Sequence, residues 1–531
     1  MLSSLVPTTD SLHSIYTEDA LPCQHKRWRA LLAQFNSLYG NSPSFVSRSP
    51  GRVNIIGEHI DYSLYGVLPM AITADVLLAV STTNSTVFEN SYEVKLCNIK
   101  PEDFPSHVFK VQNETVEIDS TLHEWSNYFK SGLKGAIDVL RKKHGNRFKP
   151  KSMKILMDGS LPVGGGLSSS AAFVSASALA VLFANGETSI DKTTLTELAI
   201  ISERAVGVNT GGMDQSASVF SIRGSALYVS FMPVLNTEVV TFPKTNPELN
   251  FLIAQSFVQS DKHVTGPVCY NLRVVECSMA AAYLHATLTD KEETKPLSPD
   301  SSPLAISLRS FHESYFSKSL LSFKDQLSEL VDLTKSVLKE EKGYTREEIA
   351  RVIGCTVLEL NNRFMFKFPV RAERFMLRQR AIHVFSEARR VLDFLSLLET
   401  QKGIDGDSDT STEDFNHRLG NLMNLTQDSC RENYACSCPE IDDLCEIARR
   451  AGAYGSRLTG AGWGGCTVHL VPKNKLEDVK MALEENYYSK RKLTEKKRNN
   501  AVVISKPGSG SAVYVVGSEF GKDLGNFSQR S

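Results

Sequence analysis

One short segment, Ser49–Tyr62, holds a high density of side chains that could do chemistry. It places Arg52, Glu58, His59 and Asp61 beside a Pro-Gly corner and a short apolar run. A solvated turn between two strands would explain the segment taken alone, because charged loops are common. Charge this dense next to a buried strand more often serves a ligand, and two further segments favour that interpretation.

The second segment, Val163–Ala172, is a glycine loop that runs into a helix of small residues. Gly164, Gly165 and Gly166 leave backbone N–H groups unshielded by a Cβ, and the helix that starts near Ser168 adds its positive end. Such a loop can bind a triphosphate, and its serine hydroxyls could also reach a magnesium ion. It is not a Walker loop, because no Lys follows the glycines. A packing or capping role is the alternative for a triple glycine alone.

Two acids follow in a region rich in glycine. Asp214 lies in the turn Gly211–Gln215, where an N-cap is the alternative to a functional carboxylate. Glu203 lies in the preceding predicted helix and could equally be a solvated surface acid. A third segment, Ser456–Leu470, is another glycine-rich turn that runs into a predicted strand.

Length and composition narrow the class of protein. A chain of 531 residues exceeds one ordinary hydrophobic core, and its net charge of -1 provides no field to gather nucleic acid. The N-terminus lacks a secretory signal, and the most apolar predicted helix is too short to span a bilayer. The ten cysteines fit reduced thiols better than a disulfide framework. We therefore predict a cytoplasmic protein that binds neither nucleic acid nor membranes.

The elements that must position these groups follow from the hydrophobic pattern. The first half of the chain alternates strands and helices, whereas the chain from Tyr270 onward is mainly helical. We predict an N-terminal α+β lobe of residues 1–245 and a C-terminal α+β lobe of residues 246–531, with helices over a small antiparallel sheet. The strands expected in this second sheet include 466–471, 501–505 and 512–516.

The three segments, in this order, resemble the signature motifs of the superfamily of galactose, homoserine, mevalonate and phosphomevalonate kinases. Within it, the chain is most similar to galactokinases, and to fungal members in particular, over nearly its full length. Pro50–Tyr62 resembles their sugar signature, Val163–Ala172 their phosphate loop, Gly211–Gln215 their base-bearing turn and Gly460–Gly465 their third motif. The resemblance implies a two-lobed small-molecule kinase fold of the α+β class, with the active site in the cleft between the lobes.

The resemblance also implies an activity, the ATP-dependent phosphorylation of the C1 hydroxyl of α-D-galactose. Asp214 would accept the proton of that hydroxyl, while Arg52 beside it would keep the carboxylate ionised and offset phosphoryl charge. The substrate-binding residues that it implies are Arg52, Glu58, His59, Asp61, Gly211, Asp214 and Tyr270.

The nucleotide side of the site follows from the same resemblance. The ATP-binding residues that it implies are Trp125, Gly164, Gly165, Gly166, Leu167, Ser168, Ser169, Ser170, Ser260 and Lys262. Analogy with mevalonate kinases implies that Ser170 and Glu203 bind Mg²⁺. Asp261, which stands where a nucleotide-contacting Ser-Asn-Lys has an amide, departs from the pattern.

Two other kinds of protein share these motifs. N-acetylgalactosamine kinases have nearly all of them but typically carry Phe at the counterpart of Tyr270. Kinase-like fungal galactose sensors bind sugar and ATP and engage a transcriptional repressor, and those without catalysis lack two residues of the run that is complete here as Ser168–Ala172. Galactokinase is therefore the favoured interpretation, with galactose and ATP as partners and a repressor as a partner only if the chain also acts as a sensor.

Overall fold

The computed structural model describes residues 4–83, 91–112, 116–119, 124–145, 148–162, 164–207, 210–259, 266–289, 297–366, 370–401 and 411–517. Its first layer is a seven-stranded sheet built around two long antiparallel strands, β2 (Phe45–Ile56) and β3 (Leu68–Thr83). Strand β2 is buried at every position, which explains why its sequence does not alternate between apolar and polar residues. The strand order is β1-β13-β2-β3-β6-β4-β5, with β1 (Thr8–Thr9), β13 (Ala512–Val515), β6 (Ser152–Gly159), β4 (Ser91–Asn98) and β5 (His107–Gln112).

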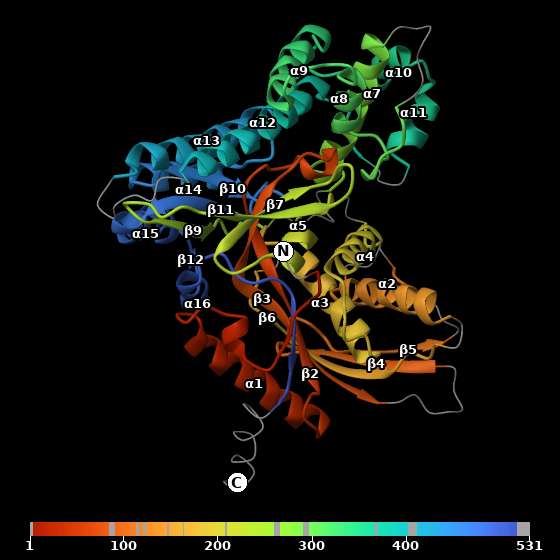
Figure 1. Ribbon diagram of the computed structural model, residues 1–531, viewed down its shortest axis with the longest axis vertical. Helices are drawn as coiled ribbons and strands as arrows, with labels where there is room; N and C mark the ends of the chain where they lie inside the picture. The colour runs from red at the N-terminus through yellow and green to blue at the C-terminus, as the bar shows by residue number, and fades with distance from the viewer. Residues whose placement is uncertain are drawn as a thin grey trace.

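Helices cover both faces of this sheet (Figure 1). Alternate residues of β3 face opposite cores, because Leu77 packs with α1 (Leu21–Tyr39) while Leu78 packs with the larger core. The helices packed on that second face are α2 (Ser126–His144), α3 (Ser169–Ala184), α4 (Lys192–Arg204) and α5 (Met213–Phe220). Small residues are needed in α3 because it is buried nearly all round, between the sheet and the helices α2, α4 and α5.

The second sheet is antiparallel, in the order β10-β11-β9-β12. Its strands are β10 (Gly455–Thr459), β11 (Cys466–Pro472), β9 (Leu249–Gln255) and β12 (Val502–Ser505), and the helices packed around it include α13 (Glu413–Glu432), α14 (Pro439–Arg450) and α15 (Leu476–Leu483). A π-helical turn (Glu484–Tyr488) and α16 (Glu495–Asn499) lead into β12. The hairpin of β7 (Ser225–Ser230) and β8 (Asn236–Thr241) lies beside β3.

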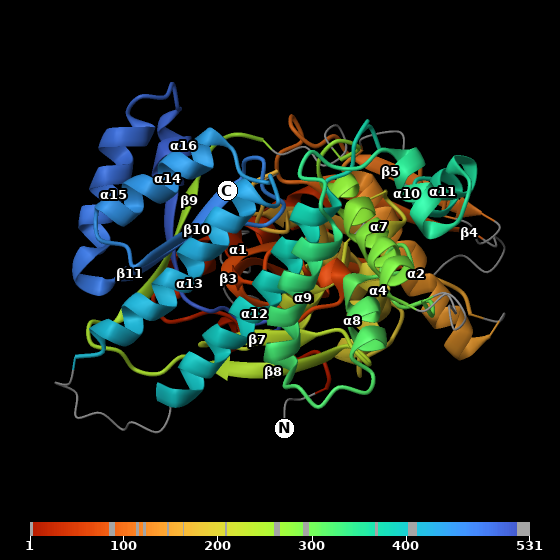
Figure 2. The ribbon, with the colours of Figure 1, turned by 90° about the horizontal axis from the view of Figure 1, so that it is seen from above.

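A layer of helices completes the molecule (Figure 2). Seen from above, α12 (Leu377–Gln401) lies between α13 and α9 (Phe323–Val337), and it also packs against α7 (Tyr270–Leu288). The remaining helices of this layer are α8 (Leu308–Tyr315), α10 (Arg346–Ile353) and α11 (Val357–Phe364). Short 3-10 turns occur at Leu12–Ser14, Asp61–Ser63 and Lys473–Lys475.

The last strand corrects one expectation. We expected 512–516 in the small C-terminal sheet, but β13 lies in the seven-stranded sheet, antiparallel to β2 and parallel to β1. The chain reaches this place through a tight crossing at Gly510, where a Cβ would lie 2.4 Å from the carbonyl oxygen of Val219. Arg48 of β2 holds the crossing by donating hydrogen bonds to the carbonyl oxygens of Ser509 (2.7 Å) and Gly510 (2.8 Å). The lobe boundary near residue 245 stays a prediction.

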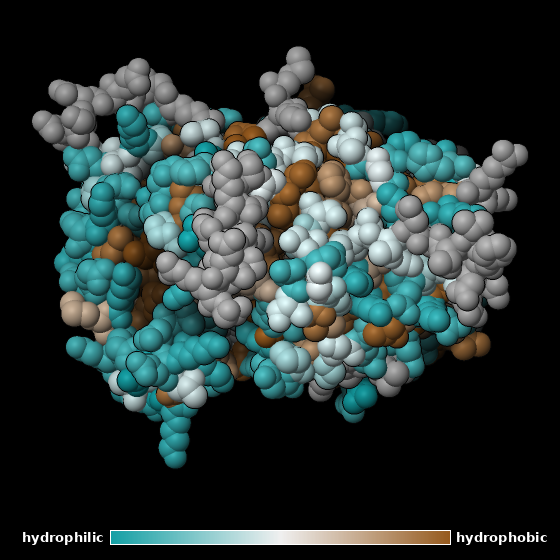
Figure 3. Space-filling view, turned by 90° about the horizontal axis from the view of Figure 1, so that it is seen from below, coloured by the Kyte–Doolittle hydropathy of each residue, from teal (hydrophilic) through white to brown (hydrophobic). Residues whose placement is uncertain are grey.

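A membrane span requires a helix of sufficient length and apolarity. None of the helices in the described part of the chain is both long enough and apolar enough to cross a bilayer. Seen from below, hydrophobic residues form separate groups among hydrophilic ones (Figure 3).

Candidate active site

Arg52 is positioned by an irregularity in β2. The pairing register with β3 shifts between Pro50 and Arg52, and the backbone N–H of Arg52 donates to the carbonyl oxygen of Leu167 instead (3.2 Å). A Cβ on Gly51 would lie 2.6 Å from that same carbonyl oxygen and 2.4 Å from Leu161. Glycine is therefore required where the strand and the glycine loop meet.

The guanidinium of Arg52 joins the predicted base to the glycine loop. Its Nε donates to Oδ1 of Asp214 at 2.7 Å, and its Nη1 donates to the carbonyl oxygen of Gly166 at 2.8 Å. Asp214 lies in the first turn of α5, whose N-cap is Gly212, so the N-cap alternative for Asp214 is wrong. Burial by itself lowers the pKa of Arg52, but the charges of Asp214 and its neighbours raise it above the usual value. Arg52 is therefore a permanent cation within a buried ion pair.

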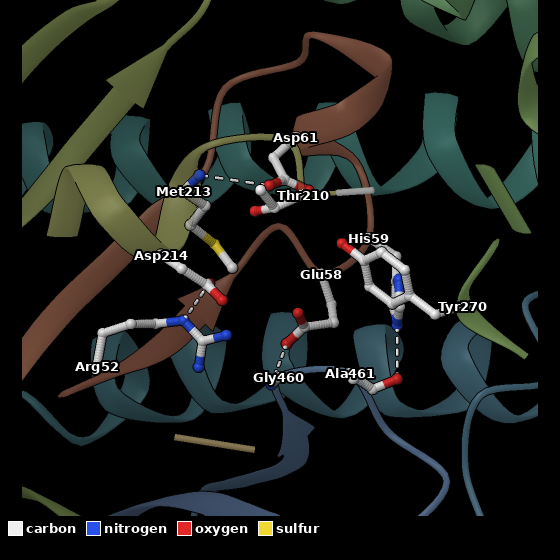
Figure 4. A pocket seen from close by; sticks show the side chains of 10 residues that line it. All are labelled: Arg52, Glu58, His59, Asp61, Thr210, Met213, Asp214, Tyr270, Gly460 and Ala461. Carbon is white, nitrogen blue, oxygen red and sulfur yellow. Dashed lines mark hydrogen bonds and ion pairs between the residues drawn. The ribbon is translucent and has the colours of Figure 1, made fainter. Parts of the chain in front are cut away.

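A pocket that opens to solvent lies beside this ion pair (Figure 4). Every expected substrate-binding residue lines it except Gly211. The full lining is Arg52, Glu58, His59, Asp61, Thr210, Met213, Asp214, Tyr270, Gly460 and Ala461. Segments from the sugar signature, the base-bearing turn, the start of α7 and the third motif thus meet around one small polar space.

Gly211 shapes the pocket by letting Asp61 approach the base-bearing turn. A Cβ on Gly211 would lie 2.4 Å from Oδ2 of Asp61, so any larger residue would displace the carboxylate. That oxygen accepts a hydrogen bond from the backbone N–H of Met213 at 3.3 Å. Burial raises the pKa of the Asp61 carboxyl, and the nearby charge of Asp214 raises it further, to about 6.

Glu58 is held by a residue that the sequence analysis missed. Its Oε2 accepts hydrogen bonds from Nη2 of Arg457 (2.5 Å) and from the backbone N–H of Gly460 (3.1 Å). Arg457 is fully buried in β10 and also donates to the carbonyl oxygen of Asn54. The sequence offered one signal for Arg457: it is a charged residue in a strand that leads directly into the third glycine motif.

His59 and Tyr270 form an aromatic wall of the pocket. Both ring nitrogens of His59 contact protein groups: Nε2 lies 2.9 Å from the carbonyl oxygen of Ala461, and Nδ1 lies 3.0 Å from the hydroxyl of Tyr62. Burial by itself lowers the pKa of His59, but its neighbours, led by Cys436, raise it above the usual value. The Tyr270 ring lies 5.5 Å from that of His59, and its hydroxyl points into the pocket (Figure 4).

The glycine loop owes its composition to contact with the third motif. Gly166 has φ of 72°, and a Cβ on Gly460 would lie only 2.1 Å from the Gly166 carbonyl oxygen. Similarly, a Cβ on Gly465 would lie 3.1 Å from backbone atoms of Gly165. Two backbones in direct contact leave no room for side chains, so both motifs need glycine. Together they position the N-terminus of α3, which begins at Ser169.

Two features of this loop suit a phosphate-bearing ligand. Ser168 adopts the left-handed conformation (φ 59°), which is uncommon for a residue other than glycine. Its buried hydroxyl has no hydrogen-bond partner among the described residues. A bound phosphate oxygen would supply the partner that this hydroxyl lacks.

The two predicted magnesium ligands are in direct contact. The Ser170 hydroxyl donates to Oε1 of Glu203 at 2.6 Å, and the side-chain amide of Gln215 donates to Oε2. Only 1% of Glu203 is exposed, so its interpretation as a solvated surface acid is wrong. A magnesium ion beside the loop would find one hydroxyl and one carboxylate here, with nucleotide phosphates as further ligands.

Comparison with known sequences places this geometry in a family. The galactokinase galactose-binding signature matches residues 33–82, and the N- and C-terminal domains of GHMP kinases, the four-kinase superfamily named above, match residues 127–221 and 412–489. The galactokinase of Saccharomyces cerevisiae is 41% identical over 514 residues, covering 91% of this chain and 94% of its own. That of Schizosaccharomyces pombe is 39% identical over 531 residues, covering 96% and 98%.

The chain belongs to the galactokinase family.

The fold of this chain is similar to that of a solved galactokinase structure. Lactococcus lactis galactokinase, complexed with galactose, superposes with a TM-score of 0.62 at 22% identity and covers 92% of this chain and 99% of its own. At this identity the likeness concerns the fold alone. It confirms the expected two-lobed α+β kinase fold.

The predicted adenine contact, Trp125, packs against α3, the helix that follows the glycine loop. Trp125 precedes α2, and its ring stacks on Phe173 of α3 with centroids 5.9 Å apart and an angle of 15° between the planes. Its Nε1 donates to the carbonyl oxygen of Pro105 at 3.0 Å. The other predicted nucleotide contacts outside the loop, Ser260 and Lys262, lie outside the described residues.

The raised pKa of Asp61 predicts a pH effect on galactokinase activity. An ionised carboxylate accepts hydrogen bonds, whereas the protonated form loses part of that capacity. Because the Asp61 carboxyl becomes protonated as the pH falls through about 6, kcat/KM for galactose should decrease below that pH. The pH profile of kcat/KM, measured on wild type and Asp61→Asn, checks this expectation.

The variant is required because His59 lines the same pocket and also titrates. The maximal kcat/KM of Asp61→Asn should be lower than that of wild type, and its pH profile should show no decrease near pH 6. An acid limb that persists unchanged in Asp61→Asn would assign the titration to another group.

Proposed function

We propose that this chain transfers the γ-phosphoryl group of ATP to the C1 hydroxyl of α-D-galactose, forming galactose 1-phosphate. Its family gives the activity class, that of a galactokinase. The observation that carries the detailed proposal is the position of Arg52, which contacts both Asp214 in the sugar pocket and Gly166 in the glycine loop. A sugar in the pocket and a triphosphate on the loop would meet at this residue.

In the proposed mechanism, Asp214 orients the C1 hydroxyl and accepts its proton. The hydrogen bond from Arg52 fixes Oδ1, which limits rotation of the carboxylate. Phosphoryl transfer passes through a loose transition state, so positioning and charge stabilisation matter more than base strength. Arg52 can supply both positioning and positive charge, because it contacts Asp214 and the carbonyl oxygen of Gly166 in the glycine loop.

The proposed nucleotide site is the loop from Gly164 to Ser170. The Ser168 hydroxyl, which has no hydrogen-bond partner in the described part of the chain, and the N-terminus of α3 support binding of the ATP phosphates there. Mg²⁺ is proposed at Ser170 and Glu203, where it would offset charge on the transferred phosphoryl group. A cytoplasmic location and a transcriptional-repressor partner stay predictions.

Glu203→Ala tests the magnesium proposal. We expect it to raise the Mg²⁺ concentration needed for half-maximal rate and to lower kcat, because a hard cation loses a carboxylate ligand. Galactose affinity measured without nucleotide should stay close to that of wild type, since Glu203 does not line the sugar pocket. Unchanged magnesium dependence would give Glu203 a structural role, through contacts that include its bonds to Ser170 and Gln215.

One assay tests the proposed function against its two alternatives. ATP consumption is measured for wild type with galactose, glucose and N-acetylgalactosamine. We expect turnover with galactose above both other sugars. A preference for N-acetylgalactosamine would identify the chain as an N-acetylgalactosamine kinase, and galactose binding without any turnover would identify it as a sensor.

A further inference from the structure

A buried carboxylate outside the pocket contacts the backbone of the sugar signature. Glu387 lies near the middle of α12 and has no exposed surface. Its Oε1 accepts hydrogen bonds from the backbone N–H groups of Gly57 (2.8 Å) and Glu58 (3.2 Å). One turn earlier on the same helix, Nε2 of His383 lies 3.0 Å from the carbonyl oxygen of Glu58. Three contacts from one helix therefore hold three consecutive peptide units.

The turn that these contacts hold is conformationally demanding. It begins where β2 ends at Ile56, and both Gly57 (φ 102°) and His59 (φ 60°) adopt positive φ. A Cβ on Gly57 would lie 3.1 Å from the side chain of Val391, so the turn also packs tightly against α12. Such conformations persist only when their surroundings hold them, and α12 holds the backbone of this turn.

The protonation states of Glu387 and His383 match these hydrogen bonds. Burial by itself raises the pKa of Glu387, but the charge of Arg390, with other neighbouring cations, lowers it to about 2, so the group is a carboxylate that can only accept. Burial lowers the pKa of His383 to about 3, so its ring is neutral. Since Nε2 faces a carbonyl oxygen, it carries the proton, and Nδ1 accepts from the hydroxyl of Ser429 (2.9 Å).

We propose that Glu387 and His383 are positioning residues for the sugar pocket. They do not line the pocket, but they hold the backbone from which Glu58 and His59 enter it. Sugar binding thus depends on a helix far away in the sequence. The inference rests on the proposed function of the pocket as the galactose site.

The first experiment exploits the two oxygens of Glu387. Oε1 serves the turn, and Oε2 accepts from Nε of Arg390 at 2.7 Å. In Glu387→Gln the single amide oxygen can accept hydrogen bonds from the N–H groups of the turn or from Arg390, but not from both. We expect the KM for galactose to rise about tenfold, with the KM for ATP nearly unchanged, because buried N–H groups of the turn lose their acceptor.

Arg390→Met is the matched control, because it removes the ion pair and leaves the contacts of Oε1 to the turn. It should lower the unfolding temperature without raising the KM for galactose. In the double variant Glu387→Gln/Arg390→Met, the amide oxygen no longer has to serve Arg390, so the KM should return toward that of wild type. Equal KM values for Glu387→Gln and Arg390→Met, or no recovery in the double variant, would overturn the proposal.

His383 provides a test that does not depend on the folding of the Glu387 variants. His383→Leu removes the donor to the Glu58 carbonyl, whereas His383→Gln keeps an N–H that can reach it. We expect the KM for galactose to rise severalfold in His383→Leu and less in His383→Gln. Equal effects would overturn the positioning role of His383.

Calorimetric titration of galactose without nucleotide separates this proposal from the proposed function. If wild type binds galactose but phosphorylates no sugar, the proposed function fails, while weakened galactose binding in Glu387→Gln would still support positioning. If wild type is active and Glu387→Gln binds galactose as tightly as wild type, the positioning proposal fails alone.

Discussion

Asp214→Asn is expected to lower kcat by ~10² or more while the protein still folds and binds galactose. The amide keeps the shape of the side chain, and its oxygen can still accept the hydrogen bond from Arg52 (2.7 Å in the wild type). It cannot accept the proton of the sugar hydroxyl. Because the loss concerns a step that occurs only in the transition state, kcat and kcat/KM should fall together. Steady-state kinetics and galactose titration of the variant measure both effects.

Asp158→Asn is a suitable control for this experiment. Asp158 also forms a buried ion pair with an arginine, Arg27, at 2.6 Å, but it does not line the pocket. The control should lose stability and retain kcat. A kcat of Asp214→Asn close to that of wild type would remove Asp214 from the proton-accepting role.

Sugar selectivity is the second large effect that we expect. A pocket built to hydrogen-bond hydroxyls leaves buried polar groups unpaired when a hydroxyl is missing or misplaced, so discrimination can reach ~10⁴. Glu58, Asp61 and Tyr270 present such groups to the pocket. We therefore expect kcat/KM for galactose to exceed that for its C4 epimer glucose by ~10⁴.

Tyr270→Phe is expected to relax selection against N-acetylgalactosamine. Tyr270 points its hydroxyl into the pocket, and removing that oxygen makes room for the bulk that the acetamido group adds at C2 (Figure 4). The measurement is kcat/KM for galactose, glucose and N-acetylgalactosamine on wild type and variant.

Tyr92→Phe is the control for this change. The Tyr92 hydroxyl is buried in β4 and has no hydrogen-bond partner among the described residues. Removal of this hydroxyl should leave kcat/KM unchanged for galactose, glucose and N-acetylgalactosamine. If Tyr270→Phe also left the ratio of galactose to N-acetylgalactosamine unchanged, the Tyr270 hydroxyl would not contribute to selection at C2.

The sequence alone was sufficient to predict the motifs and the local structure that they require. A run of glycines before a small-residue helix predicted the loop Gly164–Gly166 and the helix that begins at Ser169. The turn at Gly211 predicted a positioned Asp214. These two predictions succeed because positive φ and close backbone contact depend on single residues, and glycine is the residue that tolerates both. The Pro-Gly corner expected beside Arg52 is wrong, because β2 continues through Pro50 and Gly51 with only a shift in its pairing register. The roles in catalysis and binding stay predictions.

Only the tertiary structure decided which distant groups meet. Nothing local distinguishes a strand that pairs in the first sheet from one that pairs in the second, so β13 was expected in the wrong sheet. Arg457 and Glu387 each contact Glu58 or its backbone from more than 300 residues away, and neither was predicted. A buried charge in a strand or helix resembles a surface charge until its partner is known. Its burial and its pairing are consequences of how the lobes pack, and that packing depends on the whole chain.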